Sequence, residues 1–180
     1  MMGTDEFRAG VGTLGRMGFS VDAWLLHPQL TELAALAQAV PDTQIILDHL
    51  GGPLGIGGYA GRRDEVFEEW KPGIDEAAAC PNIALKVGGI GMEWYFGMGW
   101  HELPTPPPSE QVAEYWGDWI RYAVDAFGPD RCMFESNFPV DRASLPYSVL
   151  WNAFQILGSG YDEAEQDQLF AGTARRVYRL

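Results

Sequence analysis

Short apolar runs that each end in polar side chains are the feature that most restricts how this chain can fold. Residues 44–53 read Gln-Ile-Ile-Leu-Asp-His-Leu-Gly-Gly-Pro, so an apolar run stops at an Asp-His pair and is followed by glycines and a proline. The pattern recurs at residues 20–28, 82–89 and 131–139. Parallel α/β folds build active sites from polar groups at the C-terminal ends of buried strands. The runs therefore predict strands of this kind.

Segments in which apolar residues recur at helical spacing separate these strands. The pattern predicts strands over residues 19–26, 45–47, 83–87 and 132–134, and helices over 7–17, 30–40, 64–78, 109–127, 148–157 and 163–178. We expect Pro72 to interrupt the third helix and Ser109 to cap the fourth. Alternating strands and helices require a parallel sheet, because each right-handed crossover returns the chain to the same end. All the polar strand ends therefore face one rim.

The length of the chain limits how much of a barrel it can form. Four β/α units make half of a (β/α)8 TIM barrel, and a whole barrel typically needs ~250 residues. The chain has 180 residues, and no linker or repeat divides it. We expect an α/β fold, a partial TIM barrel of about four parallel β/α units, as a single domain over residues 1–180.

Composition excludes several classes of partner. The formal net charge of −13 disfavours nucleic acid and anionic membrane surfaces. No apolar stretch approaches the ~20 residues that span a bilayer, and the N-terminus lacks a signal-peptide pattern. The cysteines, Cys80 and Cys132, have neither metal-ligand spacing nor a disulfide-rich setting. We expect a cytoplasmic protein that acts on a small molecule, with no nucleic acid and no membrane as partner.

Four segments carry a resemblance to a known family. They are residues 46–53 (Ile-Leu-Asp-His-Leu-Gly-Gly-Pro), 81–89 (Pro-Asn-Ile-Ala-Leu-Lys-Val-Gly-Gly), 127–139 (Phe-Gly-Pro-Asp-Arg-Cys-Met-Phe-Glu-Ser-Asn-Phe-Pro) and 174–180 (Ala-Arg-Arg-Val-Tyr-Arg-Leu). In this order and spacing the chain resembles the C-terminal half of the amidohydrolase-related TIM-barrel hydrolases. That family includes lactonase-like and decarboxylase-like enzymes. The resemblance implies a hydrolase of a small ester or lactone, or a related decarboxylase of a small carboxylic acid.

The chain departs from the family pattern at the residues that bind metal. The family's first strand carries a His-x-His pair, and its metal-dependent members read Ser-Asp-x-Pro in the last strand. This chain has no His-x-His, and residues 136–139 read Ser-Asn-Phe-Pro. Asn137 can offer a carbonyl oxygen or an N–H donor, but it cannot ionise. Glu135 can supply a carboxylate if it faces the lumen. Family members bind divalent metals such as zinc, whereas we expect no metal ligands and no cofactor in this chain.

Candidate catalytic residues stand at the strand ends. We assign His49 to proton transfer, the alternative being a buried imidazole bonded to a loop carbonyl. Glu135 and Asn137 complete the catalytic set, with Asn137 orienting water or substrate. Neighbouring strand residues point in opposite directions, so we expect Asp48 to cap the loop.

Candidate substrate-binding residues are Lys86, His27, Trp94 and Trp100. Lys86 either holds an anionic group of the substrate or is a salt-bridged strand lysine. His27 either binds substrate or begins a helix beside Pro28. Trp94 and Trp100 belong to an aromatic segment that forms a lid over the rim or a hydrophobic plug, and we favour the lid. We expect His101 to lie on the surface, and Trp116 and Trp119 to lie in the core.

A second class of function follows from the missing half of the barrel. Two free edge strands and an uncovered lumen face promote association. The alternative is therefore a non-catalytic half barrel that acts as a binding or assembly subunit. For either class we expect a homo-oligomer, or association with a missing N-terminal half-barrel.

Overall fold

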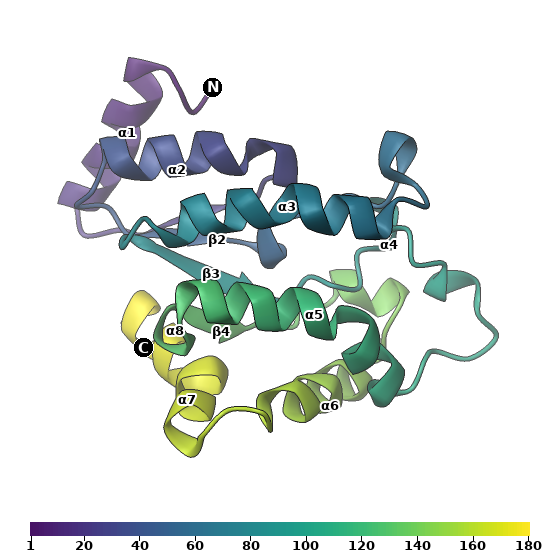
Figure 1. Cartoon of the computed structure of the whole chain (residues 1–180). Coiled ribbons are helices and arrows are strands. Elements are labelled where there is room, and N and C mark those ends of the chain that lie inside the picture. Colours follow the sequence, from purple (N-terminus) through teal and green to yellow (C-terminus); the bar gives the residue numbers. More distant parts are fainter.

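A four-stranded parallel sheet forms the centre of the computed structural model, which describes residues 1–180 (Figure 1). The strands are β1 (Val21–Ala23), β2 (Ile45–Leu47), β3 (Ile83–Val87) and β4 (Cys132–Phe134), and they pair in the order β1-β2-β3-β4. This order confirms the predicted partial barrel of parallel β/α units. Strands β1 and β4 each have one unpaired edge.

One helix precedes the first strand, and the others connect the strands or follow the last one. They are α1 (Asp5–Arg16), α2 (Leu30–Ala39), α3 (Arg63–Ala78), α4 (Glu93–Phe96), α5 (Ser109–Phe127), α6 (Tyr147–Gly158), α7 (Glu163–Asp167) and α8 (Thr173–Tyr178). A π-helical segment, Gln168–Gly172, joins α7 to α8, so the predicted last helix is present with a change of winding.

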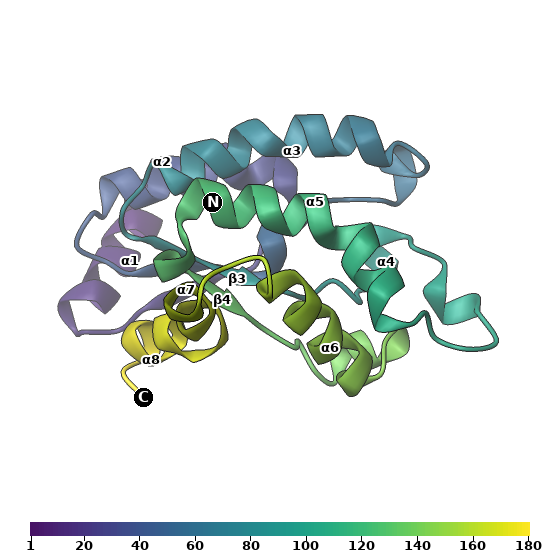
Figure 2. The same cartoon turned by 60° about the horizontal axis from the view of Figure 1, so that its bottom comes forward.

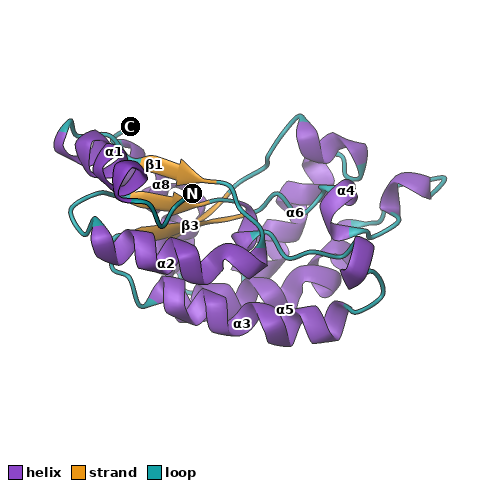
Figure 3. Ribbon diagram, turned by 90° about the horizontal axis from the view of Figure 1, so that it is seen from above, coloured by secondary structure: helices purple, strands orange, loops and turns teal.

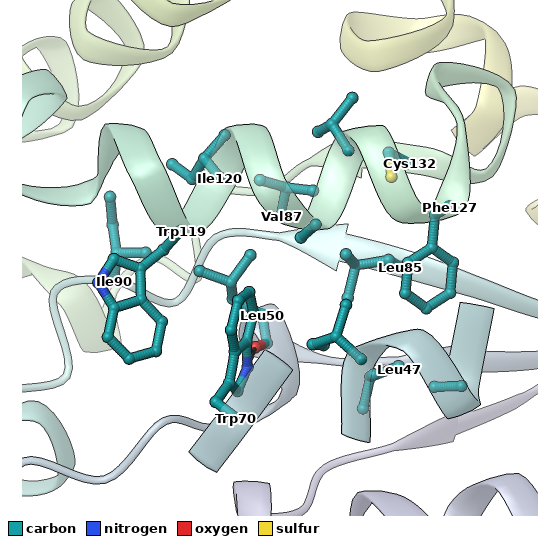
Figure 4. Packing of buried hydrophobic residues seen from close by; sticks show 14 of the residues in the cluster. Leu47, Leu50, Trp70, Leu85, Val87, Ile90, Trp119, Ile120, Phe127 and Cys132 are labelled. Carbon is teal, nitrogen blue, oxygen red and sulfur yellow. Dashed lines mark hydrogen bonds between the residues drawn. The ribbon is translucent and has the colours of Figure 1, made fainter. Parts of the chain in front are cut away.

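The main hydrophobic core lies between the sheet and the helices α2, α3 and α5, which Figure 3 shows on one side of the strands. Alternate strand residues such as Leu47 and Leu85 point toward these helices and are fully buried. Figure 4 shows them packed with Trp70 of α3 and with Trp119 and Phe127 of α5. The predicted core position of Trp119 is therefore confirmed.

The opposite face of the sheet would face the lumen of a closed barrel, and we call it the lumen face. The part of this face that lies farther from the rim carries an apolar cluster, in which Ile46, Ala84 and Met133 pack with Val177 of α8. Figures 1 and 2 place α8 beside β4 at this end of the sheet. The register aligns Ile46 with Ala84, and the same alternation brings polar residues to the lumen face nearer the rim.

Three local expectations were wrong. Pro72 lies inside an unbroken α3, because buried residues on both sides of it pack on the same core and outweigh the local loss of one N–H. Ser109 is the first residue of α5, whose cap position is Pro108 without a side-chain bond. The first strand is shorter than residues 19–26.

None of the helices combines the length and the apolar character that crossing a membrane requires.

Candidate active site

A histidine and a glutamate from two different strand ends meet at the rim of the sheet. His49 Nδ1 lies 2.5 Å from Glu135 Oε1, and the same oxygen accepts the backbone N–H of His49 at 3.2 Å. Both side chains are 15% exposed. A carboxylate bonded to one ring nitrogen fixes the orientation of an imidazole and leaves the other nitrogen for chemistry. The structure therefore brings His49 and Glu135 together as a pair.

Backbone geometry explains how His49 reaches this position. His49 and Leu50 both have φ of 55°, in the left-handed region, and Gly51 and Gly52 continue the turn with positive φ. The turn breaks the strand alternation directly after Asp48. Asp48 and His49 therefore both lie on the lumen face. Glu135 lies there too, because it stands two residues after Met133 of β4.

A glycine-rich loop after β3 packs directly against the pair. A Cβ atom at Gly88 would lie 2.3 Å from Cγ of Glu135, and one at Gly89 would lie 2.6 Å from Nδ1 of His49. Gly89 also has φ of 66°, which other residues rarely adopt. Glycine at these positions lets the backbone fill the space beneath both side chains.

Asp141 lies under the same loop and holds Asn137. Its Oδ2 accepts the backbone N–H of Gly91 at 3.0 Å, and its Oδ1 accepts the Asn137 amide at 2.8 Å. The carboxylate is fully buried. Burial raises the pKa of Asp141 to about 6, against the opposing effect of its two hydrogen bonds. Asn137, two residues after Glu135 in the chain, is therefore held through its side-chain amide by a buried carboxylate.

Lys86 is neutralised by carboxylates on the lumen face. Its Nζ lies 2.5 Å from Asp22 Oδ1 and 3.0 Å from Asp48 Oδ1, and the Tyr178 hydroxyl donates to Asp22 at 2.5 Å. Burial alone would lower the pKa of Lys86, but the bonds to Asp22, Tyr178 and Asp48 outweigh it and raise the pKa. These contacts favour the salt-bridged alternative for Lys86.

The expectation that Asp48 caps the loop was wrong. It occupies the position before the turn at residues 49–51, yet its side chain makes no capping bond. The pairing register places it beside Lys86 on the next strand, which supplies a full charge instead of a backbone N–H. Burial raises the pKa of Asp48 despite Lys86.

His27 is buried away from the pair. Its Nδ1 accepts the backbone N–H of Leu54 at 3.2 Å, and its backbone N–H donates to the Gly52 carbonyl at 2.9 Å. Its ring packs edge-on against Tyr59. Burial lowers its pKa. His27 begins a short 3-10 helix with Pro28, and these bonds anchor the loop that follows β2.

The aromatic segment divides between core and rim. Trp100 is 6% exposed and packs on Tyr115, as the plug interpretation requires, whereas Trp94 is 50% exposed. Tyr95 contacts Trp24 with ring centroids 5.4 Å apart, and Trp24 contacts the His49 ring at 4.7 Å. This part of the segment therefore reaches the rim. The substrate-binding roles of Trp94 and Trp100 stay predictions. His101 is half exposed, as expected.

The side chains at the rim do not fit a complete zinc site. Zinc takes four ligands, of which the protein supplies at least three. No group of three or more His, Cys, Asp or Glu side chains lies close enough together to hold a metal ion. His49 contributes one free nitrogen, since Glu135 occupies the other, and Asn137 contributes no charge. The expected lack of metal in the purified chain stays a prediction.

Several residues at the site had no clear signal in the sequence. Asp141, Trp24, Asp22 and the loop at residues 88–91 meet the predicted residues only through the fold. The glycine pairs in residues 51–52 and 88–89 were the available signal, because glycines after buried strands indicate close backbone approach.

Known proteins resemble nearly the whole of this chain in sequence. The uncharacterized protein y4mH of Sinorhizobium fredii is 36% identical over 178 residues, which cover 98% of this chain and 52% of that protein. L-fucono-1,5-lactonase of Burkholderia multivorans is 29% identical over 178 residues, covering 97% of this chain and 56% of the enzyme. The chain thus spans about half the length of these curated relatives.

Solved structures resemble the whole of the chain. A crystal structure of an amidohydrolase from Burkholderia multivorans with bound HEPES has a TM-score of 0.86 at 26% identity, and covers 99% of this chain and 59% of its own. A crystal structure of an amidohydrolase from the same organism with bound zinc has a TM-score of 0.85 at 25% identity, with the same coverage. The amidohydrolase family model matches residues 3–180. The chain therefore belongs to the amidohydrolase family.

Proposed function

We propose that this chain provides half of an active site that hydrolyses a small lactone or ester, with His49 as the proton-transfer residue and Glu135 as its partner. The observation that carries the proposal is the 2.5 Å contact between His49 Nδ1 and Glu135 Oε1 at the rim of a parallel sheet. Active sites of (β/α)8 barrels lie at this rim.

The pair has the geometry of a general base. When Nδ1–H donates to the Glu135 carboxylate, Nε2 of His49 is left as an acceptor. Nε2 takes a proton from water as the water oxygen attacks the carbonyl carbon, and Glu135 stabilises the imidazolium that forms. The C–O bond of the lactone then breaks, and the imidazolium returns the proton to the alkoxide that leaves.

The substrate class comes from the relatives. L-fucono-1,5-lactonase of Burkholderia multivorans is named for a sugar lactone, and a similar enzyme from Burkholderia ambifaria carries the same name. A small aldonolactone is therefore the first substrate to test. The rim can also serve decarboxylation of a small acid, which release of carbon dioxide would reveal.

Because the chain spans about half of its relatives, the test uses it alone and in a chimera. In the chimera, residues 3–180 replace the matching segment of the Sinorhizobium relative. We expect hydrolysis of L-fucono-1,5-lactone, and a loss of about a hundredfold or more in kcat for His49→Gln and Glu135→Gln with little change in melting temperature.

His101→Gln is the matched control, because His101 is half exposed and its ring nitrogens lie near Glu93 and Glu102 instead of Glu135. Its turnover should match the parent. If His49→Gln lowered stability and left turnover unchanged, His49 would be a core residue and the proposal would be wrong.

A non-catalytic half barrel is the second candidate. The unpaired edges of β1 and β4 favour it. It predicts that the chain binds a complementary half barrel or a second copy, and that the chimera shows no turnover with lactones or small acids.

We propose the cytoplasm as the location of the chain, in keeping with the two free and buried thiols, Cys80 and Cys132.

A further inference from the structure

The side-chain amide of Asn137 has only one possible orientation. The Asp141 carboxylate accepts from Nδ2 at 2.8 Å, and a carboxylate has no proton to offer to the amide oxygen. The NH2 group therefore faces Asp141, and the carbonyl oxygen points to the other side. Asp141 is fully buried whereas Asn137 is partly exposed, so the other side is the rim.

Asp141 is itself held firmly. The Gly91 N–H donates to its second oxygen at 3.0 Å, and its own N–H donates to the Asn137 carbonyl of the backbone at 3.2 Å. A Cβ atom at Gly91 would lie 2.7 Å from Cβ of Asp141, so the loop leaves no room for another arrangement. Two bonds join Asp141 to Asn137, and a third joins it to the loop under His49.

We propose that Asp141 is a positioning residue that presents the carbonyl oxygen of Asn137 to the rim as a hydrogen-bond acceptor. The partner it suits is an O–H donor, either a hydroxyl of a sugar lactone or the attacking water. A bare carboxylate offers no such proton and does not fit. This inference rests on the proposed function and deepens it, because it assigns a polarity to the site beside His49.

The pairing also explains why an amide stands at position 137. An aspartate there would place two carboxylates in contact in a buried setting, which is unfavourable. The pair Asn137 and Asp141 carries one negative charge, and that charge sits behind the rim instead of on it.

Stability of the chain alone tests the pairing without any activity. We compare Asn137→Asp, Asp141→Asn and the double variant with both changes, at pH 7.5. Asn137→Asp should lower the melting temperature by about 4–8 °C, since it opposes two carboxylates. The double variant restores the donor and acceptor in reversed order, and the amide oxygen introduced at position 141 can still accept from Gly91, so it should recover most of the loss. No recovery would overturn the pairing.

NMR of the side-chain amide provides a second readout on the chain alone. The NH2 resonances of Asn137 are assigned by their loss in Asn137→Asp, and the N–H that is bonded to the buried carboxylate should exchange slowly with solvent. In Asp141→Ala the exchange should become fast. Fast exchange already in the parent chain would contradict the proposed orientation.

The chimera then tests the acceptor role with two substrates. Asp141→Ala and Asn137→Ala should each lower kcat/KM for L-fucono-1,5-lactone by about tenfold or more. If a substrate hydroxyl is the donor, the loss should be much smaller with δ-valerolactone, which has no hydroxyl. If water is the donor, both substrates should lose equally.

Unchanged kcat/KM for both substrates would overturn the acceptor role. A parent chimera that turns over neither lactone contradicts the proposed function instead, while the melting temperatures and amide exchange still decide the pairing.

Discussion

Buried and half-buried carboxylates fix the positions of the residues at the site, and each carboxylate binds a different partner. Glu135 binds the His49 ring, and Asp141 binds the Asn137 amide. Glu93 shapes the aromatic segment, since its carboxylate accepts the backbone N–H groups of Gly99 at 2.5 Å and Trp100 at 3.3 Å. A carboxylate can accept several N–H donors, which suits it to hold irregular backbone.

The raised pKa of Asp141 predicts a pH dependence of stability. The folded value is about 6 and the ordinary one is 3.8, so the folded state binds the proton more tightly. Its contribution to stability is therefore complete below about pH 4 and is lost as the pH rises to about 6, by roughly 3 kcal/mol in total. Relative to Asp141→Asn, the parent chain should lose about this much unfolding free energy between pH 4 and 7, as measured by urea denaturation.

Asp118→Asn is the control for this experiment, because the Asp118 side chain is 79% exposed. Its stability should run parallel to that of the parent across the range. A parallel curve for Asp141→Asn as well would contradict a raised pKa at Asp141.

At the scale of elements, one arginine forms hydrogen bonds with the C-terminal ends of two helices at the end of the sheet opposite the rim. The Arg131 guanidinium precedes β4 and donates to the carbonyls of Phe127 at 2.9 Å, Cys80 at 3.1 Å and Ala78 at 2.9 Å. These carbonyls belong to the end of α5, the loop before β3 and the end of α3. Arg131 therefore donates hydrogen bonds to C-terminal carbonyl groups of helices that have no partner within the helix. It thereby holds two β/α units against each other.

Arg131→Met should lower the free energy of unfolding by roughly 3 kcal/mol, because several carbonyls lose a charged donor together. Arg131→Lys should recover only part of it, since an ammonium cannot reproduce the planar fork. Chemical denaturation measures both. Arg121→Met is the control, because Arg121 is 55% exposed in a surface ion pair, and it should change stability by less than about 1 kcal/mol. Equal losses of unfolding free energy in Arg131→Met and Arg121→Met would contradict this role of Arg131.

The same elements show how far the sequence predicts the fold and the site. Apolar periodicity located every strand and the long α5, because the packing that stabilises these elements is written into the spacing of the apolar residues themselves. Pro72 was misjudged, since tertiary packing on both sides of it is invisible to local rules. His49 and Glu135 were found from their strand ends. Asp141 was missed, because its partners come from a different loop and from a left-handed residue.

At the scale of the whole molecule, an incomplete sheet is combined with exposed apolar residues near its first strand. Met17 is 65% exposed and Phe19 is 56% exposed, just before the unpaired edge of β1. Such an edge favours pairing with another chain. The formal net charge of −13 opposes association of like copies.

We therefore expect the chain alone to sediment as a dimer or larger species at about 10 μM, and added salt to strengthen the association by screening repulsion. The double substitution Met17→Glu and Phe19→Glu should shift it toward monomer. Ile156→Glu, at an exposed apolar residue of α6, should not. A well-folded monomer of the parent chain at every salt concentration would exclude this assembly.

The position of α8 has a consequence for the order in which the molecule assembles. Each strand pairs with its neighbour in sequence, so the sheet closes one β/α unit at a time. The bond from Tyr178 to Asp22 instead joins residues 156 positions apart. Loop-closure entropy makes such a distant contact costly until the intervening units are in place. We therefore expect the bond between Tyr178 and Asp22 to form late, after the sheet that lies between the C-terminal helix and the first strand.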